Sequence, residues 1–187
     1  MKFLGIDKVN EGKFLTKYDI HYETALGNEK TYEMISRSKN LHSQDDLHDS
    51  PADSVVMIVT DKTGEHLLLS REFRLAIGCF IYGFPAGLID PGETSAESAR
   101  RELWEETGLD LVSIDKTFPD SYNCVGVTNE KSTCIFGKAE GTFRASTSDV
   151  EEIECGWYTK EQVKALLETE RFSARTQMVC YFWANRD

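Results

Sequence analysis

The sequence predicts an α/β protein in which helices cover a mixed β-sheet, preceded by a small N-terminal antiparallel β-hairpin. Apolar and polar residues alternate through 14–24, which is typical of a half-buried strand. The apolar run at 54–60 is typical of a buried strand. Helical spacing over 94–107 and 173–184 adds covering helices. Strands and helices that alternate in irregular order favour a mixed sheet.

The first domain is predicted to be residues 1–50, an N-terminal hairpin subdomain followed by a linker. Two strands joined by the turn Leu26-Gly27-Asn28-Glu29 form a hairpin over 13–37. A lone hairpin is marginally stable in water, so it must pack on the rest of the chain or on another subunit. Residues 38–52 are polar and turn-rich, which predicts a solvated loop. Metal binding by His42 and the acids near it is the alternative.

The second domain is predicted to be residues 51–187. It begins with two strands joined by the turn Asp61-Lys62-Thr63-Gly64. Periodicity then predicts further strands and three helices. The expected strands are 54–60, 66–70, 111–114, 121–125, 132–138 and 153–158, and the expected helices are 94–107, 160–167 and 173–184.

Composition and charge exclude some classes of function. The chain has 187 residues with 32 Asp and Glu against 21 Lys and Arg, a net charge of −11. This balance argues against binding of nucleic acid, which requires clustered cations. The apolar-leaning run at 75–89 is interrupted by glycine and proline and is too short to cross a membrane. Acids in the first twelve residues argue against a signal peptide, and five cysteines without a CxxC pair favour free thiols, so we expect a cytoplasmic protein.

The segment 87–109, GLIDPGETSAESARRELWEETGL, carries the strongest chemical signal. Thr94 with Glu97 can form a capping box, and Gly108 can end the helix in the left-handed conformation. Glutamates 102, 105 and 106 then share one side of the helix with Arg101. Like charges at this spacing destabilise a helix unless a cation lies between them. The pattern favours a Mg²⁺ site, and a solvated acidic helix is the alternative.

The wider pattern resembles the signature of the Nudix hydrolases at every defined position. It consists of Gly87, Glu93 and the run Arg101-Glu102-Leu103-x-Glu105-Glu106-x-Gly108-Leu109. The resemblance implies an α/β/α sandwich that binds Mg²⁺, or Mn²⁺ as a substitute, and hydrolyses a diphosphate linked to another group. By matching position, the principal metal ligands would be Glu102 and Glu106, with Glu105 and the carbonyl of Ala86 as further candidates. Glu93 and Arg101 would form an orienting pair, and Arg101 and Glu105 would support catalysis.

Outside this signature, the chain is similar to the ADP-ribose pyrophosphatase branch of the family. The similarity runs through Arg71-Glu72-Phe73-Arg74 and Phe84-Pro85-Ala86-Gly87. It implies that Arg74 contacts the diphosphate or the terminal ribose, and an ordinary surface arginine is the alternative. In that branch the N-terminal subdomain is swapped between two subunits. Phe14 and Tyr32 would sandwich adenine and Arg37 would reach the phosphates or ribose, although both aromatics could equally be strand core residues.

The general base of this branch lies in a loop in the C-terminal third. The polar segment 144–152, RASTSDVEE, lacks helix or strand periodicity and ends in Glu151 and Glu152. We take Glu152 as the first choice for the base and Glu151 as the second, with a solvated acidic loop as the alternative. One departure from the branch is that residues 123–130 lack the proline of its Ser-Pro-Gly turn.

The resemblance therefore implies a homodimeric enzyme that cleaves ADP-ribose to AMP and ribose 5-phosphate. The nearest alternative is the same chemistry on a GDP- or UDP-hexose. A Nudix-fold module that senses ADP-ribose without cutting it is a further alternative. The retained carboxylates and the lack of a basic extra domain argue against it.

Overall fold

The computed structural model describes residues 1–147 and 152–186 and divides the chain into two compact units. The N-terminal unit comprises Met1–Asp53 and Asp120–Ser132, and the C-terminal unit comprises Ser54–Pro119 and Thr133–Asp187. The predicted boundary near residue 50 lies close to the junction at residue 53. No sequence pattern indicates that the segment 120–132 joins the N-terminal unit.

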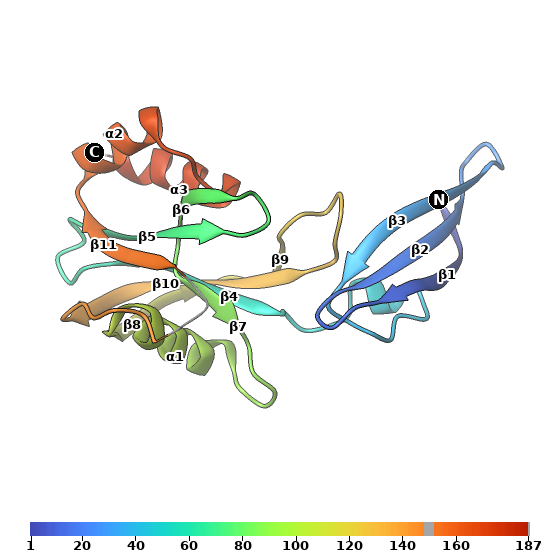
Figure 1. Ribbon diagram of the computed structural model, residues 1–187, viewed down its shortest axis with the longest axis horizontal. Coiled ribbons are helices and arrows are strands. Elements are labelled where there is room, and N and C mark those ends of the chain that lie inside the picture. The colour runs from blue at the N-terminus through green and yellow to red at the C-terminus, as the bar shows by residue number, and fades with distance from the viewer. Residues whose placement is uncertain (148–151, 187) are drawn as a thin grey trace. The chain divides into compact units, whose positions relative to one another are not determined.

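The N-terminal unit contains an antiparallel sheet in the order β1-β2-β3 (Figure 1). The strands are β1 (Lys2–Glu11), β2 (Thr16–Glu23) and β3 (Glu29–Ser36). The predicted antiparallel hairpin over 13–37 is confirmed as β2 and β3, and the structure adds a third strand, β1, that the sequence pattern does not indicate. Two register shifts interrupt the pairing of β1 with β2, so apolar residues do not alternate regularly along β1. The third strand supplies much of the support that a hairpin alone lacks.

The linker packs against this sheet instead of forming an open loop. Leu41 is buried together with Tyr18, Ile20 and Met34. A short 3₁₀ helix, η1 (Asp45–Leu47), follows. The carboxylate of Asp46 accepts backbone hydrogen bonds from His42 at 2.7 Å and from Ser43 at 2.8 Å. Most of the segment is exposed or half-buried, as expected of a solvated loop, but the buried leucine and these local bonds give it more order than its composition predicts.

The C-terminal unit is built on a sheet in which β11, β5, β4, β10 and β8 are neighbours in that order. Shorter strands pair at its borders, β6 with β5 and β7 with β4. β9 pairs with Lys131 and Ser132, the first residues of β10, and all of these residues belong to the N-terminal unit. The strands are β4 (Ser54–Thr60), β5 (Leu67–Arg74), β6 (Cys79–Gly83), β7 (Ala86–Leu88), β8 (Leu109–Thr117), β9 (Ser121–Tyr122), β10 (Lys131–Gly141) and β11 (Ile153–Tyr158).

Helices cover both faces of this sheet (Figure 1). Val55, Met57 and Val59 of β4 pack with α1 (Ser95–Thr107), whereas Val56 and Ile58 pack with the other two helices. Those helices are α2 (Lys160–Thr169) and α3 (Ala174–Ala184). The strand alternates between two apolar faces because each is covered, which explains its uninterrupted apolar sequence. The predicted class of an α/β/α sandwich is confirmed.

Apolar residues also lie outside the core. Within the described residues, no helix has the length and apolar character needed to cross a bilayer.

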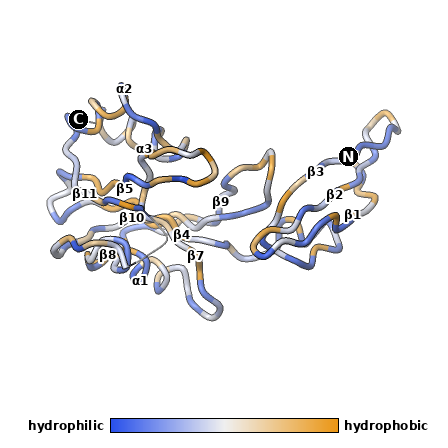
Figure 2. The backbone as a smooth tube through the Cα atoms, viewed as in Figure 1, coloured by the Kyte–Doolittle hydropathy of each residue, from blue (hydrophilic) through white to orange (hydrophobic). Residues whose placement is uncertain are grey.

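Hydrophobic residues also gather at the ends of the β5–β6 and β9–β10 loops (Figure 2). The side chains concerned are exposed, and they are Leu75, Ile77, Val125 and Val127.

Candidate active site

The loop and helix over 87–108 form the framework of the candidate site. Thr94 caps α1: its hydroxyl accepts the Glu97 N–H, and the Glu97 carboxylate accepts the Thr94 N–H at 2.8 Å. Gly108 ends the helix with φ +78°, a conformation that glycine adopts readily. The predicted helix and both of its end signals are confirmed. A loop of six residues joins β7, which contains Gly87, to the start of α1.

Arg101 is the centre of the polar network at this site. Its Nε donates to one carboxylate oxygen of Glu93 at 2.9 Å, and its Nη2 donates to the other at 2.7 Å. Nη2 also bonds the Leu88 carbonyl at 3.0 Å. The hydrogen bonds from Arg101, with a further one from Ser98, lower the pKa of Glu93 to about 2. This bidentate pair joins the loop to the helix.

Three glutamates follow on α1. Glu102 accepts a hydrogen bond from Arg101 Nη1 at 2.7 Å, and Glu105 lies 3.4 Å from the same nitrogen. The carboxyl group of Glu102 also lies directly against Gly87, where an added Cβ would overlap it. The signature glycine is therefore needed because its missing side chain leaves the space for Glu102.

Glu106 is the most buried of these carboxylates, with 9% of the residue exposed. It faces the sheet near Cys155 of β11. Burial raises the pKa of the Cys155 thiol to about 12, and the charges of Glu106 and Glu72 act in the same direction. The helix thus presents carboxylates that range from buried to half-exposed along one side.

The donor types suit a hard divalent cation, which takes oxygen ligands from carboxylates and carbonyls. Ala86, whose carbonyl the sequence suggests as a ligand, is an exposed residue at the start of β7. No three acidic, histidine or cysteine side chains of residues 1–147 and 152–186 are gathered closely enough to hold a metal ion. The guanidinium of Arg101 instead forms ion pairs with Glu102 and Glu105. The residue types fit Mg²⁺, and its binding would require these two carboxylates to exchange the guanidinium for the ion.

The residues predicted to contact substrate or activate water lie at the ends of neighbouring strands. Glu152 is exposed, and its carbonyl accepts the N–H of Phe73 at 3.0 Å. Arg74, next along β5, donates to Glu72 at 2.6 Å. Backbone pairing therefore brings Glu152 beside the strand end that carries Arg74. The alternative base, Glu151, lies outside the described residues.

Sequence reasoning misses two polar residues of this region. Ser98 donates to Glu93 at 2.5 Å, and Arg144 donates through Nη2 to the Trp104 carbonyl at 2.7 Å. A serine within a helix carries no distinctive sequence signal. Arg144 lies in a segment that the sequence identifies only as polar, so its contact with the helix depends on tertiary structure.

The N-terminal unit holds the remaining predicted residues, and the structure does not bring Phe14 and Tyr32 together. Tyr32 lies opposite Ile20, four residues into β2, whereas Phe14 is in the turn before β2 begins. Four residues of strand span about 13 Å. Arg37 forms an ion pair with Glu130 of the same unit. The rings of one protomer therefore do not face each other across a single base.

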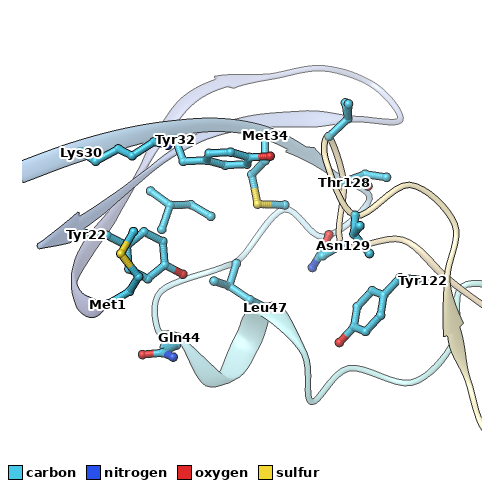
Figure 3. Close-up of a pocket in the computed structure, with 13 residues that line it drawn as sticks. Met1, Tyr22, Lys30, Tyr32, Met34, Gln44, Leu47, Tyr122, Thr128 and Asn129 are labelled. Carbon is cyan, nitrogen blue, oxygen red and sulfur yellow. The ribbon is translucent and has the colours of Figure 1, made fainter. Parts of the chain in front are cut away.

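Tyr32 instead lines a hollow of about 650 Å³ within the N-terminal unit (Figure 3). Its hydroxyl donates to the Gly126 carbonyl at 2.7 Å. Tyr22 and Tyr32 come from the sheet, and Tyr122 and Asn129 come from the 120–132 segment. This volume is in the range of small-molecule sites. Phe14 does not line it and is 69% exposed.

Comparison with known proteins identifies the family. The model of the NUDIX domain matches residues 50–179. An uncharacterized Nudix hydrolase of Schizosaccharomyces pombe is 28% identical over 148 residues, which cover 79% of this chain and 69% of that protein. The ADP-ribose pyrophosphatase of Saccharomyces cerevisiae is 26% identical over 151 residues, covering 80% of this chain and 63% of its own length.

A solved structure supports the fold along most of the chain. It is a crystal structure of ADP compounds hydrolase, with a TM-score of 0.74 and 20% identity. The match covers 98% of this chain and 92% of that one. The expected resemblance is confirmed by the domain match, and its signature residues form the loop and helix described above. The chain belongs to the NUDIX family, as a Nudix hydrolase.

Proposed function

We propose that this protein hydrolyses the diphosphate of a nucleoside-diphosphate sugar, with ADP-ribose cleaved to AMP and ribose 5-phosphate. The observation that carries the proposal is the arrangement on α1, where Arg101 links Glu93 of the loop to Glu102 and Glu105 of the helix. The relative from Saccharomyces cerevisiae, an ADP-ribose pyrophosphatase, supports this choice of substrate.

Mg²⁺, with Mn²⁺ as a substitute, is the proposed cofactor. Glu102 and Glu106 would be its principal ligands, with Glu105 and the carbonyl of Ala86 as further ones. When bound, the ion would neutralise the diphosphate and lower the pKa of a water molecule. This accounts for how a chain of net charge −11 could bind an anionic substrate.

The protein's own residues would bind substrate and move the proton. Glu152 would accept the proton of the attacking water as general base. Arg74, at the exposed end of β5, would contact the diphosphate or terminal ribose, exchanging Glu72 for the substrate. Arg101 would hold Glu93 of the loop and the glutamates of α1 in fixed relative positions without contacting the substrate.

The N-terminal unit is proposed to bind the nucleoside. Tyr32 and the hollow beside it offer aromatic surface for a flat base, and stacking on such rings suits any purine or pyrimidine. Phe14 and Arg37 would contribute from another part of the unit. Because Phe14 and Tyr32 lie at different levels of the sheet, adenine is not favoured over other bases on geometry. Hydrolysis of a GDP- or UDP-hexose is therefore the second candidate function.

We further propose a homodimer formed through the N-terminal unit. Large apolar side chains are exposed on it, including Phe14 at 69% and Val125 at 76%. Exposed apolar side chains mark contact surfaces where they form a contiguous patch. Light scattering at assay concentration should give the mass of two chains, and the mass of one chain would contradict this.

One experiment tests the reaction and substrate together. The purified chain is incubated with Mg²⁺ and ADP-ribose, GDP-mannose, UDP-glucose or NAD, and the products are identified by mass. We expect AMP and ribose 5-phosphate from ADP-ribose, and loss of both when a chelator removes the metal. Faster cleavage of a non-adenine compound would support the second candidate. Binding of ADP-ribose without turnover of any compound would instead indicate a sensor.

A further inference from the structure

Strand β5 carries two arginine–glutamate pairs, one on each face of the sheet. Arg74 Nη1 donates to the Glu72 carboxylate at 2.6 Å. Arg71 Nη1 lies 3.9 Å from the carboxylate of Glu154 on the neighbouring strand β11. Side chains alternate between the two faces of a strand, so positions 72 and 74 share one face and position 71 lies on the other. The two pairs therefore place the same types of group in different surroundings.

The face that carries Glu72 is the one that packs against α1. Leu68, four residues earlier on β5, belongs to the core cluster that contains Ala99 and Leu103 of the helix. Because the side-chain period of a strand is two residues, Glu72 projects from the same face as Leu68. This carboxylate therefore lies on the side of the sheet that faces the proposed metal ligands.

The neighbours of Glu72 reduce its contact with water. Ile153 of β11 and Ile81 of β6 are its partners in the two adjacent strands, and paired residues project from the same face. Burial is the main cause of the raised pKa of the Cys155 thiol, and the charges of Glu106 and Glu72 add to it. Cys155 is thus within electrostatic reach of both carboxylates. A carboxylate in such surroundings depends on a cationic partner.

Arg74 is the exposed member of this pair. Its side chain is 55% exposed, whereas that of Glu72 is 21% exposed. A guanidinium matches the geometry of a phosphate group as well as that of a carboxylate. A diphosphate that binds Arg74 therefore competes with a carboxylate that is already bonded to it. The negative charge of Glu72 also remains close to the position that the diphosphate would occupy.

We propose that Glu72 is a specificity-determining residue, whose carboxylate competes with the substrate for Arg74 and disfavours a further phosphate beside the diphosphate. This inference rests on the proposed function, because it takes Arg74 as the residue that contacts the diphosphate or the terminal ribose. A sugar attached to the diphosphate is neutral, whereas the third phosphate of a nucleoside triphosphate adds negative charge near Glu72. Such like-charge repulsion selects against the wrong ligand. Glu72 thus favours nucleoside-diphosphate sugars over nucleoside triphosphates.

The test compares Glu72→Gln with the original chain on ADP-ribose and on ATP. Glutamine keeps the shape of the side chain and can still accept a hydrogen bond from Arg74, but it lacks the charge. We expect the KM for ADP-ribose to fall about threefold, with kcat little changed, because a competing anion has been removed. The KM for ATP, or its Ki if ATP is not cleaved, should fall on the order of 10-fold.

Three results would overturn the inference. The first is a KM for ADP-ribose that rises or stays the same in Glu72→Gln. The second is a gain for ATP that is no larger than the gain for ADP-ribose. The third is an absence of both cleavage of ATP and inhibition by ATP in the original chain and in the variant.

Two further variants separate the local charge from net charge and from shape. Glu154→Gln is the matched control, because it removes the same charge from the pair on the other face, where the glutamate side chain is 78% exposed. It should leave the constants for both compounds unchanged, and a gain equal to that of Glu72→Gln would overturn the inference. Glu72→Asp keeps the charge and should retain the preference for ADP-ribose over ATP.

A double-mutant comparison tests whether Glu72 acts through Arg74. Arg74→Met should raise the KM for ADP-ribose, and adding Glu72→Gln should then lower it less than in the original chain, because the contested group is gone. A full gain in that background, or an unchanged KM in Arg74→Met alone, would overturn the inference. Failure of the proposed function is distinguishable, because it would appear as absent Mg²⁺-dependent hydrolysis in the unaltered chain. Calorimetric Kd values for the same two compounds would then replace KM.

Discussion

Arg101 and Glu93 form a two-point ion pair, with donor to acceptor distances of 2.9 Å from Nε and 2.7 Å from Nη2. The pair joins residues eight positions apart, one in the loop and one in the helix. Because Arg101 also reaches Glu102 and Glu105, its orientation is coupled to the proposed metal ligands. Loop, helix and carboxylates therefore share one hydrogen-bonded network.

This pair predicts a specific pH dependence of stability. The pKa of Glu93 is about 2 in the folded chain, against 4.5 for the free carboxyl group. A lowered pKa stabilises the folded state fully above pH 4.5, and this contribution is lost as pH falls toward 2. Glu93→Gln should lower the free energy of unfolding at pH 7, and its difference from the original chain should shrink below pH 4.5.

Denaturant unfolding at a series of pH values measures this difference. Arg101→Lys should behave like Glu93→Gln, because lysine cannot make the two-point contact. Arg100→Lys, one position earlier on the exposed side, serves as the control and should not change the pH dependence. A difference between Glu93→Gln and the original chain that is constant from pH 7 to 3 would contradict the role given to the pair.

A second prediction concerns Gly87. A methyl group at this position would overlap the Glu102 carboxyl group and force it to move. Gly87→Ala should therefore lower kcat with Mg²⁺ at least about 10-fold, since small displacements of positioned groups are costly. Gly83→Ala is the matched control, because a Cβ there would meet Ser70 Oγ at an ordinary 3.4 Å. Equal activity in the two variants would show that the position of Glu102 is unimportant.

Much of this framework could be predicted because its signals are local. The capping box at Thr94, the stop at Gly108 and the spacing of Arg101 from its glutamates act within one loop and helix. The burial of both faces of β4 could also be predicted, because it requires only the uninterrupted apolar sequence at 54–60. Local interactions of this kind leave a readable pattern in the order of residues.

The features that the sequence does not predict depend on contacts between segments that are distant along the chain. β1 is interrupted by two register shifts and is recognised only by its pairing with β2. Tyr32 bonds Gly126, 94 residues away, and Arg144 bonds Trp104, 40 residues away. No periodicity reports such contacts. The separation of Phe14 from Tyr32 likewise follows from strand register, which turns and pairing determine.

A third prediction tests the metal site. Glu106→Gln keeps the shape of this buried side chain but removes the charge that a Mg²⁺ ligand needs. The kcat should fall at least about 100-fold, because the variant lacks a carboxylate that is proposed to bind the catalytic Mg²⁺. The thermal midpoint should remain close to that of the original chain. Glu168→Gln, an exposed change on α2, is the control, and near-normal kcat in Glu106→Gln would show that the metal assignment is wrong.

A fourth prediction asks how Tyr32 acts on the nucleoside. Tyr32→Phe removes only the hydroxyl that bonds Gly126, whereas Tyr32→Leu also removes the ring. If the ring stacks on a base, Tyr32→Leu should raise KM about 10-fold while kcat changes little, because stacking stabilises ground and transition states alike. Tyr32→Phe should retain most of the affinity. If both variants raise KM equally, the hydrogen bond to the 120–132 segment is what matters, and Tyr32 shapes the hollow without stacking.

The last prediction assigns the general base. Glu152→Gln should lower kcat at least about 100-fold with little change in KM, since a base acts in the transition state and not in binding. Glu154→Gln, two residues along on β11 and exposed, is the matched control and should keep its kcat. A loss of equal size in Glu151→Gln, with Glu152→Gln near normal, would reassign the base to the neighbouring carboxylate.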